Sequence, residues 1–455
     1  MISDLTKAVA NYLDRVSWPE TLAAFLLCLA ILQDGAGVLI KDLNLHKIVW
    51  YVMYFGGALL VAHLFRVVPP TKLLKKNILY LVLVGIALSS TFWTIDQIST
   101  IKRLFHLSGQ LLLVFGIGYT LKNTRFVTFT YYFLLLNVVL SAVVAIMIPE
   151  VGVGQYKGED AWHGLTYNKN TLGMLSSLCV IFSFFYYMAA KGSLHISSAI
   201  AVAFLSVLVA HKTDSATALI CLIIAGVYAV VLHLLSNTIR WFSFSVLFFP
   251  VFVALALVLL LLVDLRFADI TQLVGRSDTL TNRTEIWAES WELTLDKPLA
   301  GYGFGTIFYP YSDIAVYNHY EYFDVRHGDA PIIHAHNGFL TVSTQLGMPA
   351  AVIAIYIVLS MLVKNLYRYL YSLSFQSIVS STLALFLFVY NFAEDTLFRP
   401  QDTLWTLFLI LLVMPYTNSG HLHARKNQNQ RKRQLKKKSR RKLTRRKTRK
   451  PVTSQ

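Results

Sequence analysis

The chain has 455 residues, of which 55% are hydrophobic and only 14% are charged. Soluble domains carry about 25% charged residues, so this composition excludes an ordinary soluble protein, and an aromatic content of 13% excludes a largely disordered one. The formal net charge of +17 is concentrated in residues 421–455, which hold 16 Lys and Arg and no acidic residue. The rest of the chain is nearly neutral, so the charge does not indicate that the folded part binds nucleic acid.

Twelve apolar runs are each long enough, or nearly so, to cross a membrane as a helix, which takes about 20 residues. The sequence therefore predicts an all-α polytopic membrane protein with about 12 transmembrane helices. The count depends on the polar run 103–121 and on the short run 401–416. In chain order the expected spans are 18–38, 47–66, 77–95, 103–121, 126–148, 171–190, 195–212, 216–235, 241–264, 337–362, 376–397 and 401–416.

Basic residues in the short connections indicate the orientation of these spans, because cytoplasmic loops are rich in Lys and Arg. With an even number of spans and both termini in the cytoplasm, the cytoplasmic loops hold no acidic residues. Their basic residues are Arg66, Lys72, Lys75, Lys76, Lys122, Arg125, Lys191, Arg240, Lys364 and Arg368. We therefore expect both termini in the cytoplasm.

One outer loop, at about 265–336, is much longer than the others, and long loops in compact proteins are usually functional. Within it, the spacing of apolar residues predicts a short helix over Thr284–Leu295. Ile286, Trp287, Trp291 and Leu295 share roughly one face of that helix, which we expect to rest on the membrane surface or on the helical bundle. The later run GYGFG (301–305) fits either a turn or a cradle beside a ligand, since glycines allow close backbone approach.

The C-terminal segment 421–455 differs from the membrane domain, which we expect to occupy residues 1–420. Its composition predicts a disordered cytoplasmic tail, because a run of like charges repels itself and buries little apolar surface. Such a tail binds anionic lipid headgroups, each base contributing about 1 kcal/mol near the surface. It contains no interleaved aromatic residues, so we expect no nucleic-acid partner.

Polar residues that are costly at membrane depth gather in several connections that all fall on the predicted outer side. Taken singly, each charge also fits an interfacial position with its head group in water. Topology therefore permits a single outward-facing site. These residues are Lys102, Arg103, His106, Trp162, His163, Tyr167, Asn168, Lys169, Asn170, His211, Lys212, Asp214, Ser215, Arg276, Arg283, His334, His336, Asn337, Glu394, Asp395 and Arg399.

Three segments resemble the motifs of a known family. They are LTNRTEIW…DKPLAGYGFG (280–305), HAHNGFL…QLGMPA (334–350) and WHGLTYNKNTLG (162–173), the last ending in a Lys-Asn-x-x-Gly pattern. In order and spacing they resemble the O-antigen ligase/polymerase superfamily of bacterial membrane glycosyltransferases, and most closely its exopolysaccharide polymerases. The number of spans and the single large loop resemble the same family.

This resemblance implies a substrate, a reaction and a location. The donor is a glycan on undecaprenyl diphosphate in the outer leaflet of the bacterial cytoplasmic (inner) membrane. An acceptor glycan hydroxyl attacks the anomeric carbon and the lipid diphosphate leaves, with no cofactor, nucleotide sugar or metal ion. A flippase and a chain-length regulator are the implied protein partners.

The charge of the diphosphate indicates which residues do this chemistry. Fixed cations must neutralise it, and the planar fork of arginine binds phosphate through two hydrogen bonds. Arg283, in the family's R-x-x-I/V-W pattern, and His336, the general base expected before Asn-Gly-Phe, are the predicted catalytic residues. The predicted substrate-binding residues, for diphosphate or sugar, are Arg103, Lys169, Lys212, Arg276, His334, Asn337, Glu394, Trp287 and Tyr302.

Two alternatives remain open. The first is a ligase that joins the glycan to lipid A core. Such ligases tend to carry an arginine in the outer turn after span 195–212, where this chain has Lys212, and this difference favours a polymerase. The second is a multi-pass transporter, against which the chain shows no inverted repeat and places its charges at one face rather than at the midplane.

Overall fold

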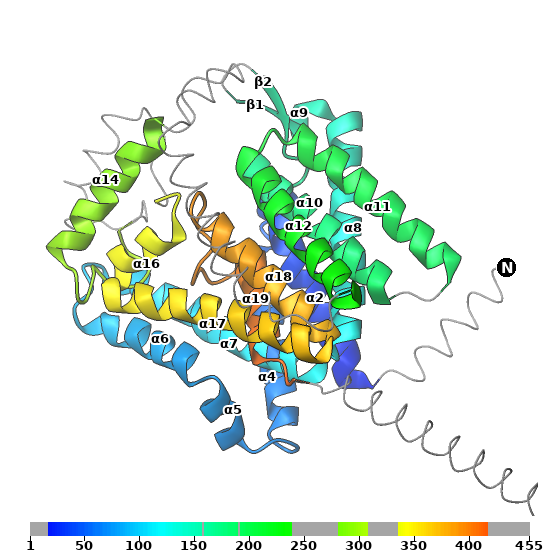
Figure 1. The fold of residues 1–455 in the computed structure, drawn as a ribbon. Helices are drawn as coiled ribbons and strands as arrows, with labels where there is room; N and C mark the ends of the chain where they lie inside the picture. Colours follow the sequence, from blue (N-terminus) through cyan, green and yellow to red (C-terminus); the bar gives the residue numbers. More distant parts are fainter. Residues whose placement is uncertain (1–16, 157–158, 190–191, 239–280, 308–334, 417–455) are drawn as a thin grey trace, which may run out of the picture.

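The computed structural model describes residues 17–156, 159–189, 192–238, 281–307 and 335–416, and within these ranges the chain is mostly helical (Figure 1). The predicted span 241–264, much of the loop 265–336 and the tail 421–455 lie outside them. The helices are α2 (Trp18–Gly35), α3 (Gly37–Asp42), α4 (His46–Leu64), α5 (Pro70–Lys76), α6 (Ile78–Ser89), η1 (Ser90–Phe92), α7 (Gln97–Thr120), α8 (Asn123–Met147), α9 (Pro149–Gly152), α10 (Lys169–Ala189), α11 (Ser193–Lys212), α12 (Ala216–Thr238), α14 (Thr281–Asp296), α16 (Gly338–Leu346), α17 (Met348–Ser372), α18 (Phe375–Tyr390) and α19 (Thr403–Val413).

Among the described residues, six helices are long and apolar enough to cross a membrane: α4, α8, α10, α11, α12 and α17. Three shorter apolar helices, α6, α18 and α19, coincide with further predicted spans. The predicted spans 18–38 and 103–121 form the long helices α2 and α7, which carry more polar side chains. The fold is that of a polytopic helical membrane protein, and twelve spans are not confirmed.

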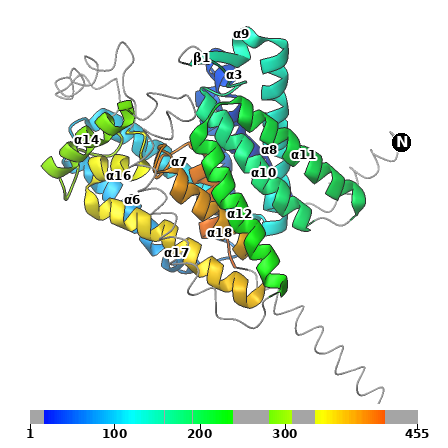
Figure 2. The ribbon, with the colours of Figure 1, turned by 45° about the horizontal axis from the view of Figure 1, so that its top comes forward.

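The two short helices α18 and α19 lie in the middle of the bundle (Figures 1 and 2). Helices α12 and α17 pack against α18, while α2 and α7 pack against α19. Nearly every residue of α18 and α19 is buried, including Trp405 and Phe408 with no exposed surface. Both helices are therefore covered on all sides by protein rather than lipid, including the buried polar residues in the first half of α18.

The predicted span 337–362 is two helices rather than one, which corrects the sequence prediction. Gly347 separates α16 from α17 with a positive φ of 84°. A Cβ atom at this position would lie 2.4 Å from the backbone carbonyl carbon of Leu299. Because only glycine combines this φ with such close backbone approach, the chain turns here and α16 becomes a separate helix that packs against α14 and α17.

The predicted helix in the long loop exists as α14, but its buried face differs from the predicted one. Ile286, Ser290 and Leu293 are buried where α14 packs against α16, whereas Trp291 and Leu295 are 48% and 53% exposed. These three residues, spaced i, i+4 and i+7, form the face of α14 that meets α16. The small side chain of Ser290 lets the two helices approach closely. The predicted apolar face is therefore not the face that meets the bundle, and its contact with the membrane surface stays a prediction.

A small hairpin precedes α10. Strands β1 (Val153–Tyr156) and β2 (Glu159–Trp162) pair antiparallel, with Val153 opposite Trp162. The chain then turns into α10, whose first residues reach the loop between α18 and α19. The hydroxyl of Tyr390, at the end of α18, donates to the backbone oxygen of Asn170, and the N–H of Thr403, at the start of α19, donates to Asp34, so connections far apart in sequence meet there.

Candidate functional site

The loop between α18 and α19 carries Glu394, the central residue of the candidate site. Hydrogen bonds within this loop and to α16 fix the shape of the loop. The side chain of Asn391 accepts from the backbone N–H groups of Thr396 and Leu397, at 3.0 and 2.8 Å. The N–H of Gly338, at the start of α16, donates to the backbone oxygens of Asn391 and Glu394. These bonds hold Glu394 next to α16.

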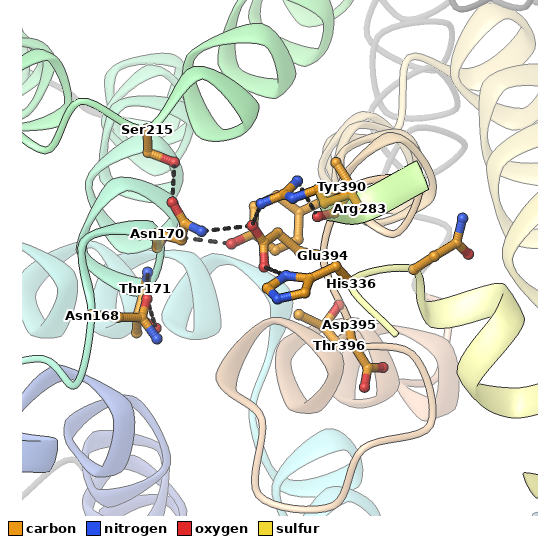
Figure 3. A network of polar contacts seen from close by, with 12 residues as sticks. Asn168, Asn170, Thr171, Ser215, Arg283, His336, Tyr390, Glu394, Asp395 and Thr396 are labelled. Atoms are coloured by element: carbon orange, nitrogen blue, oxygen red, sulfur yellow. Dashed lines mark hydrogen bonds and ion pairs between the residues drawn. The ribbon is translucent and has the colours of Figure 1, made fainter. Parts of the chain in front are cut away.

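Arg283 reaches this loop from the first turn of α14. It lies three and seven residues before Ile286 and Ser290, so it shares their buried helix face and is directed inward. Its Nη1 donates to the backbone oxygen of Ala393 at 2.6 Å, and its Nη2 donates to Oε1 of Glu394 at 2.9 Å (Figure 3). The Arg283 and Glu394 side chains are only 18% and 9% exposed, so the ion pair is largely shielded from water.

His336 approaches the second oxygen of the same carboxylate. Its Nδ1 lies 3.6 Å from Oε2 of Glu394, which is close enough for charge attraction but longer than a hydrogen bond. His336 has a φ of +49°, a left-handed conformation that a non-glycine residue seldom adopts. The next residue, Asn337, caps α16 by accepting from the N–H groups of Phe339 and Leu340. Asn337 therefore orients His336 by starting the helix behind it.

Asn170 completes the group around Glu394. Asn168 caps α10 by accepting from the N–H of Thr171, which places Asn170 in the first turn of that helix. The Nδ2 of Asn170 donates to Oε1 of Glu394 at 2.7 Å, and its Oδ1 accepts from the hydroxyl of Ser215 at 3.0 Å. The sequence grouped Asn170 and Ser215 among the outer polar residues but did not include either of them among the predicted site residues. The Lys-Asn-x-x-Gly pattern was the available indication that Asn170 belongs to the site.

Two predicted lysines lie at the margin of the cluster. Lys169 forms an ion pair with Asp214 at 3.2 Å and stands over the ring of Tyr156 at 4.9 Å. Lys212 ends α11 and is exposed. The structure therefore brings Lys169 beside Asn170 but does not bring Lys212 to Glu394 through any contact among the described residues.

Arg103 packs against the GYGFG turn (301–305). A Cβ atom on Gly305, whose φ is +75°, would lie 2.2 Å from Cγ of Arg103. Both Arg103 and His336 act electrostatically on Asp395, which follows Glu394 and is buried. Burial raises the pKa of Asp395, while nearby Arg399, Arg103 and His336 partly oppose that rise.

The aromatic candidates are placed differently from the charged ones. Tyr302 is buried and donates its hydroxyl to Asp296 at 2.6 Å, while Lys297 stands over its ring. Its backbone N–H donates to Thr344, so GYGFG serves here as a turn that fastens the long loop to α16. Trp287 is half-buried on α14. The predicted site residues Arg276 and His334 lie outside the described residues.

The N-terminal ends of α10, α14 and α16 contact Glu394, and the start of α12 joins them through Ser215 and Asn170. Asn170 is in the first turn of α10, Ser215 precedes α12, Arg283 is in the first turn of α14, and Gly338 begins α16. Each helix N-terminus carries a partial positive charge, so together with Arg283 these termini favour an anion. Among the described residues, no group of three or more His, Cys, Asp or Glu is arranged to hold a metal ion.

Comparison with known families gives a match over part of the chain. Residues 199–355 match the family model described as O-Antigen ligase. That segment runs from α11 into α17 and contains Ser215, Arg283 and His336, while Asn170 and Glu394 lie outside it. The match supports the O-antigen ligase/polymerase superfamily and a glycan-transfer function of ligase or polymerase type. A search of curated proteins finds no match.

Proposed function

We propose that this member of the O-antigen ligase/polymerase superfamily transfers a glycan from undecaprenyl diphosphate to a hydroxyl of an acceptor glycan, polymerising polysaccharide repeat units. The observation that carries this proposal is the position of Arg283 and His336 on the two oxygens of one buried carboxylate, Glu394. A phosphate-binding cation and a candidate base thus stand within one small cluster.

Arg283 binds the diphosphate of the donor in this proposal. The bond between the anomeric carbon and the diphosphate oxygen breaks, and undecaprenyl diphosphate leaves with the bonding electrons. The negative charge that develops on it is stabilised by the Arg283 guanidinium and by the surrounding helix N-termini. Because these groups already neutralise the charge, the proposed step uses no metal ion or other cofactor. Lys169, beside Asn170, and Arg103, which acts on Asp395, are the further cations proposed to extend the diphosphate site.

His336 acts as the general base for the acceptor. It removes the proton from the attacking hydroxyl as the new bond forms between that oxygen and the anomeric carbon. The ring then carries a positive charge, which Glu394 stabilises from the Nδ1 side. The proton passes to solvent after transfer. Glu394 is therefore a positioning residue, and His336 and Arg283 are the proposed catalytic residues.

The location follows from the same substrate. We propose that the site faces the outer side of the bacterial cytoplasmic membrane, with both termini in the cytoplasm and the basic tail 421–455 on anionic headgroups. A flippase that delivers the donor and a chain-length regulator are the proposed partners. Deleting 421–455 should leave transfer activity intact, which a transfer assay on the truncated protein would check.

A polymerase is favoured over a ligase because Lys212 occupies the outer turn where ligases of this family tend to carry arginine. The test uses a strain that lacks this gene and carries either the wild-type gene or His336→Ala on a plasmid. Surface polysaccharide and the undecaprenyl-linked pool are separated on one gel.

Single lipid-linked repeat units that accumulate without long polymer identify a polymerase. Long lipid-linked polymer that never reaches its final acceptor identifies a ligase instead. If neither pool changes when the gene is removed, the glycan-transfer proposal is wrong, and transport of a solute across the membrane becomes the function to test.

A further inference from the structure

One oxygen of Glu394 is held by two donors that come from different parts of the fold. Oε1 accepts from Nη2 of Arg283 on α14 at 2.9 Å and from Nδ2 of Asn170 on α10 at 2.7 Å (Figure 3). Oε2 is the oxygen that faces His336. The orientation of the carboxylate toward the histidine therefore depends on what holds Oε1.

The direction of the Asn170 amide is fixed by its neighbour. A hydroxyl next to an amide oxygen must donate to it, and the Ser215 hydroxyl lies 3.0 Å from Oδ1 of Asn170. The NH₂ group of Asn170 therefore points to Glu394. The nearby ion pair between Lys169 and Asp214 ties the start of α10 to the turn before α12 a second time. None of these supports involves Arg283.

Binding of the lipid-linked glycan affects the two hydrogen bonds to Oε1 differently. A diphosphate competes with Glu394 for the guanidinium of Arg283, since both are anions that bind the same planar fork. The diphosphate also repels the Glu394 carboxylate. If Arg283 were the only residue that holds the carboxylate, Glu394 would change its orientation when the diphosphate binds Arg283. Oε2 would then no longer face His336.

We propose that Asn170, fixed by Ser215, is the positioning residue that keeps Glu394 beside His336 when the diphosphate of the donor takes over Arg283. This inference rests on the proposed function. Asn170 is neutral, so the incoming diphosphate does not compete for it as it competes for Arg283. The hydrogen bond to Oε1 thus persists through the step in which His336 gains its proton.

The test measures transfer by the purified full-length protein, with undecaprenyl-diphosphate-linked repeat units extracted from the deletion strain as donor. Asn170→Ala should lower kcat by about tenfold to a hundredfold, the effect of losing a hydrogen bond to a charged group. The KM for the donor should change little, because Arg283 still binds the diphosphate. The control is Ser177→Ala, which removes a different α10–α12 hydrogen bond, from Ser177 to Ala218, and should leave kcat unchanged.

A second variant separates positioning from simple structural support. Asn170→Asp combined with Glu394→Gln reverses the amide and the carboxylate, so a hydrogen bond between the two positions is retained. We expect the thermal stability of this double variant in detergent to return toward that of wild type, and kcat to remain low because no carboxylate faces His336.

Three results would count against these ideas in different ways. Wild-type kcat in Asn170→Ala would overturn the inference and leave the proposed function standing. Recovery of both stability and kcat in the exchanged variant would show that the bond is only structural. If wild-type protein transfers nothing from this donor, the proposed function itself is wrong.

Discussion

Arg283 and Glu394 are 111 residues apart in the chain, yet the guanidinium donates to the carboxylate at 2.9 Å in a largely shielded position. The same carboxylate faces His336 with its other oxygen. The ion pair therefore joins the helix of the long loop to the loop between two central helices. A change at any of these three residues should alter both chemistry and stability, in ways that differ between them.

Removing the imidazole should abolish most of the transfer activity. His336→Ala is expected to lower kcat by about 10²-fold to 10⁴-fold, the usual contribution of a general base. The protein should still insert and remain folded, since His336 is part of a loop and Asn337 still caps α16. Transfer from lipid-linked repeat units measures the activity, and abundance in membranes measures folding. An unchanged kcat would exclude His336 as the base.

The left-handed backbone of His336 gives a separate prediction about stability. Its φ of +49° is strained for any residue with a Cβ atom, by roughly 1 kcal/mol or more. His336→Gly should therefore unfold at a higher temperature than His336→Ala, while both variants lack transfer activity. Thermal unfolding in detergent provides the comparison. Equal melting temperatures would mean that this backbone conformation costs nothing.

Breaking the ion pair on one side should cost more stability than removing both charges. Arg283→Ala leaves the Glu394 carboxylate without its cation in a site that is only 9% exposed on the glutamate side. An uncompensated buried charge of this kind costs a few kcal/mol, less here because Arg283 is partly exposed. Arg283→Ala with Glu394→Gln should be more stable than Arg283→Ala alone.

Both of these Arg283 variants should be inactive in transfer, because neither retains the cation for the diphosphate. The measurements are melting temperature in detergent and transfer activity. Arg283→Lys is the matched variant that keeps the charge but loses the fork, and it should retain part of the activity. If the double variant is no more stable than Arg283→Ala, the unpaired Glu394 charge does not destabilise the folded protein.

Asp395 predicts a pH dependence of stability. Burial raises its pKa above the ordinary value of 3.8, so the folded state binds this proton more tightly than the unfolded state. Its contribution to stability is complete below the unfolded pKa and is lost as the pH rises through the raised folded pKa. Asp395→Asn should therefore lose less stability than wild type as the pH rises from about 4 toward neutrality.

Melting temperatures of wild type and Asp395→Asn across that range test this expectation. Asp42→Asn is the control, since Asp42 is exposed at the end of α3. The two proteins should have similar melting temperatures at low pH. As the pH rises, the melting temperature of wild type should fall further below that of Asp395→Asn. Parallel curves would show that Asp395 does not titrate differently in the folded state.

The break between α16 and α17 depends on one glycine. Gly347→Ala should be strongly destabilising, because φ is +84° and the new Cβ would lie 2.4 Å from the Leu299 carbonyl carbon. Gly226→Ala in α12 is the matched control, since a Cβ there meets no atom within 4 Å, and alanine in a helix should keep or raise stability. Membrane abundance and melting temperature compare the two. Tolerance of Gly347→Ala would show that the chain shifts freely at this turn.

The sequence named several residues that the structure brings together, but it did not show the hydrogen bonds that connect them. Arg283 and His336 were identified from short motifs, and Glu394 from an acidic residue at the end of an apolar run. The structure brings these three together as one cluster. Asn170 was seen as part of the Lys-Asn-x-x-Gly motif and Ser215 as a polar residue, both on the predicted outer side. Their hydrogen-bonded partnership with Glu394 joins the connection before α10, the turn before α12 and the loop after α18, a relationship that no spacing along the chain reveals.

Other predictions failed where local pattern and tertiary packing disagree. The run 337–362 is long enough and apolar enough to resemble one span, but the chain turns at Gly347, where the backbone of Leu299 packs closely. The apolar stripe on α14 includes Trp291 and Leu295, although the helix meets α16 through a face containing Ser290. Apolar periodicity shows which face of a helix is apolar. It does not show whether that face packs against another helix.

The sequence by itself determined that this is a helical membrane protein with a charged C-terminal segment and its polar chemistry in the connections between helices. Composition and run length are sufficient for that, since an apolar run of about 20 residues is long enough to cross a bilayer as a helix. Only the tertiary structure decided which connections meet, that one carboxylate serves both Arg283 and His336, and that Asn170 shares it. Such a site is set by side-chain directions and packing between distant helices, and these depend on contacts that form only when the whole bundle is assembled.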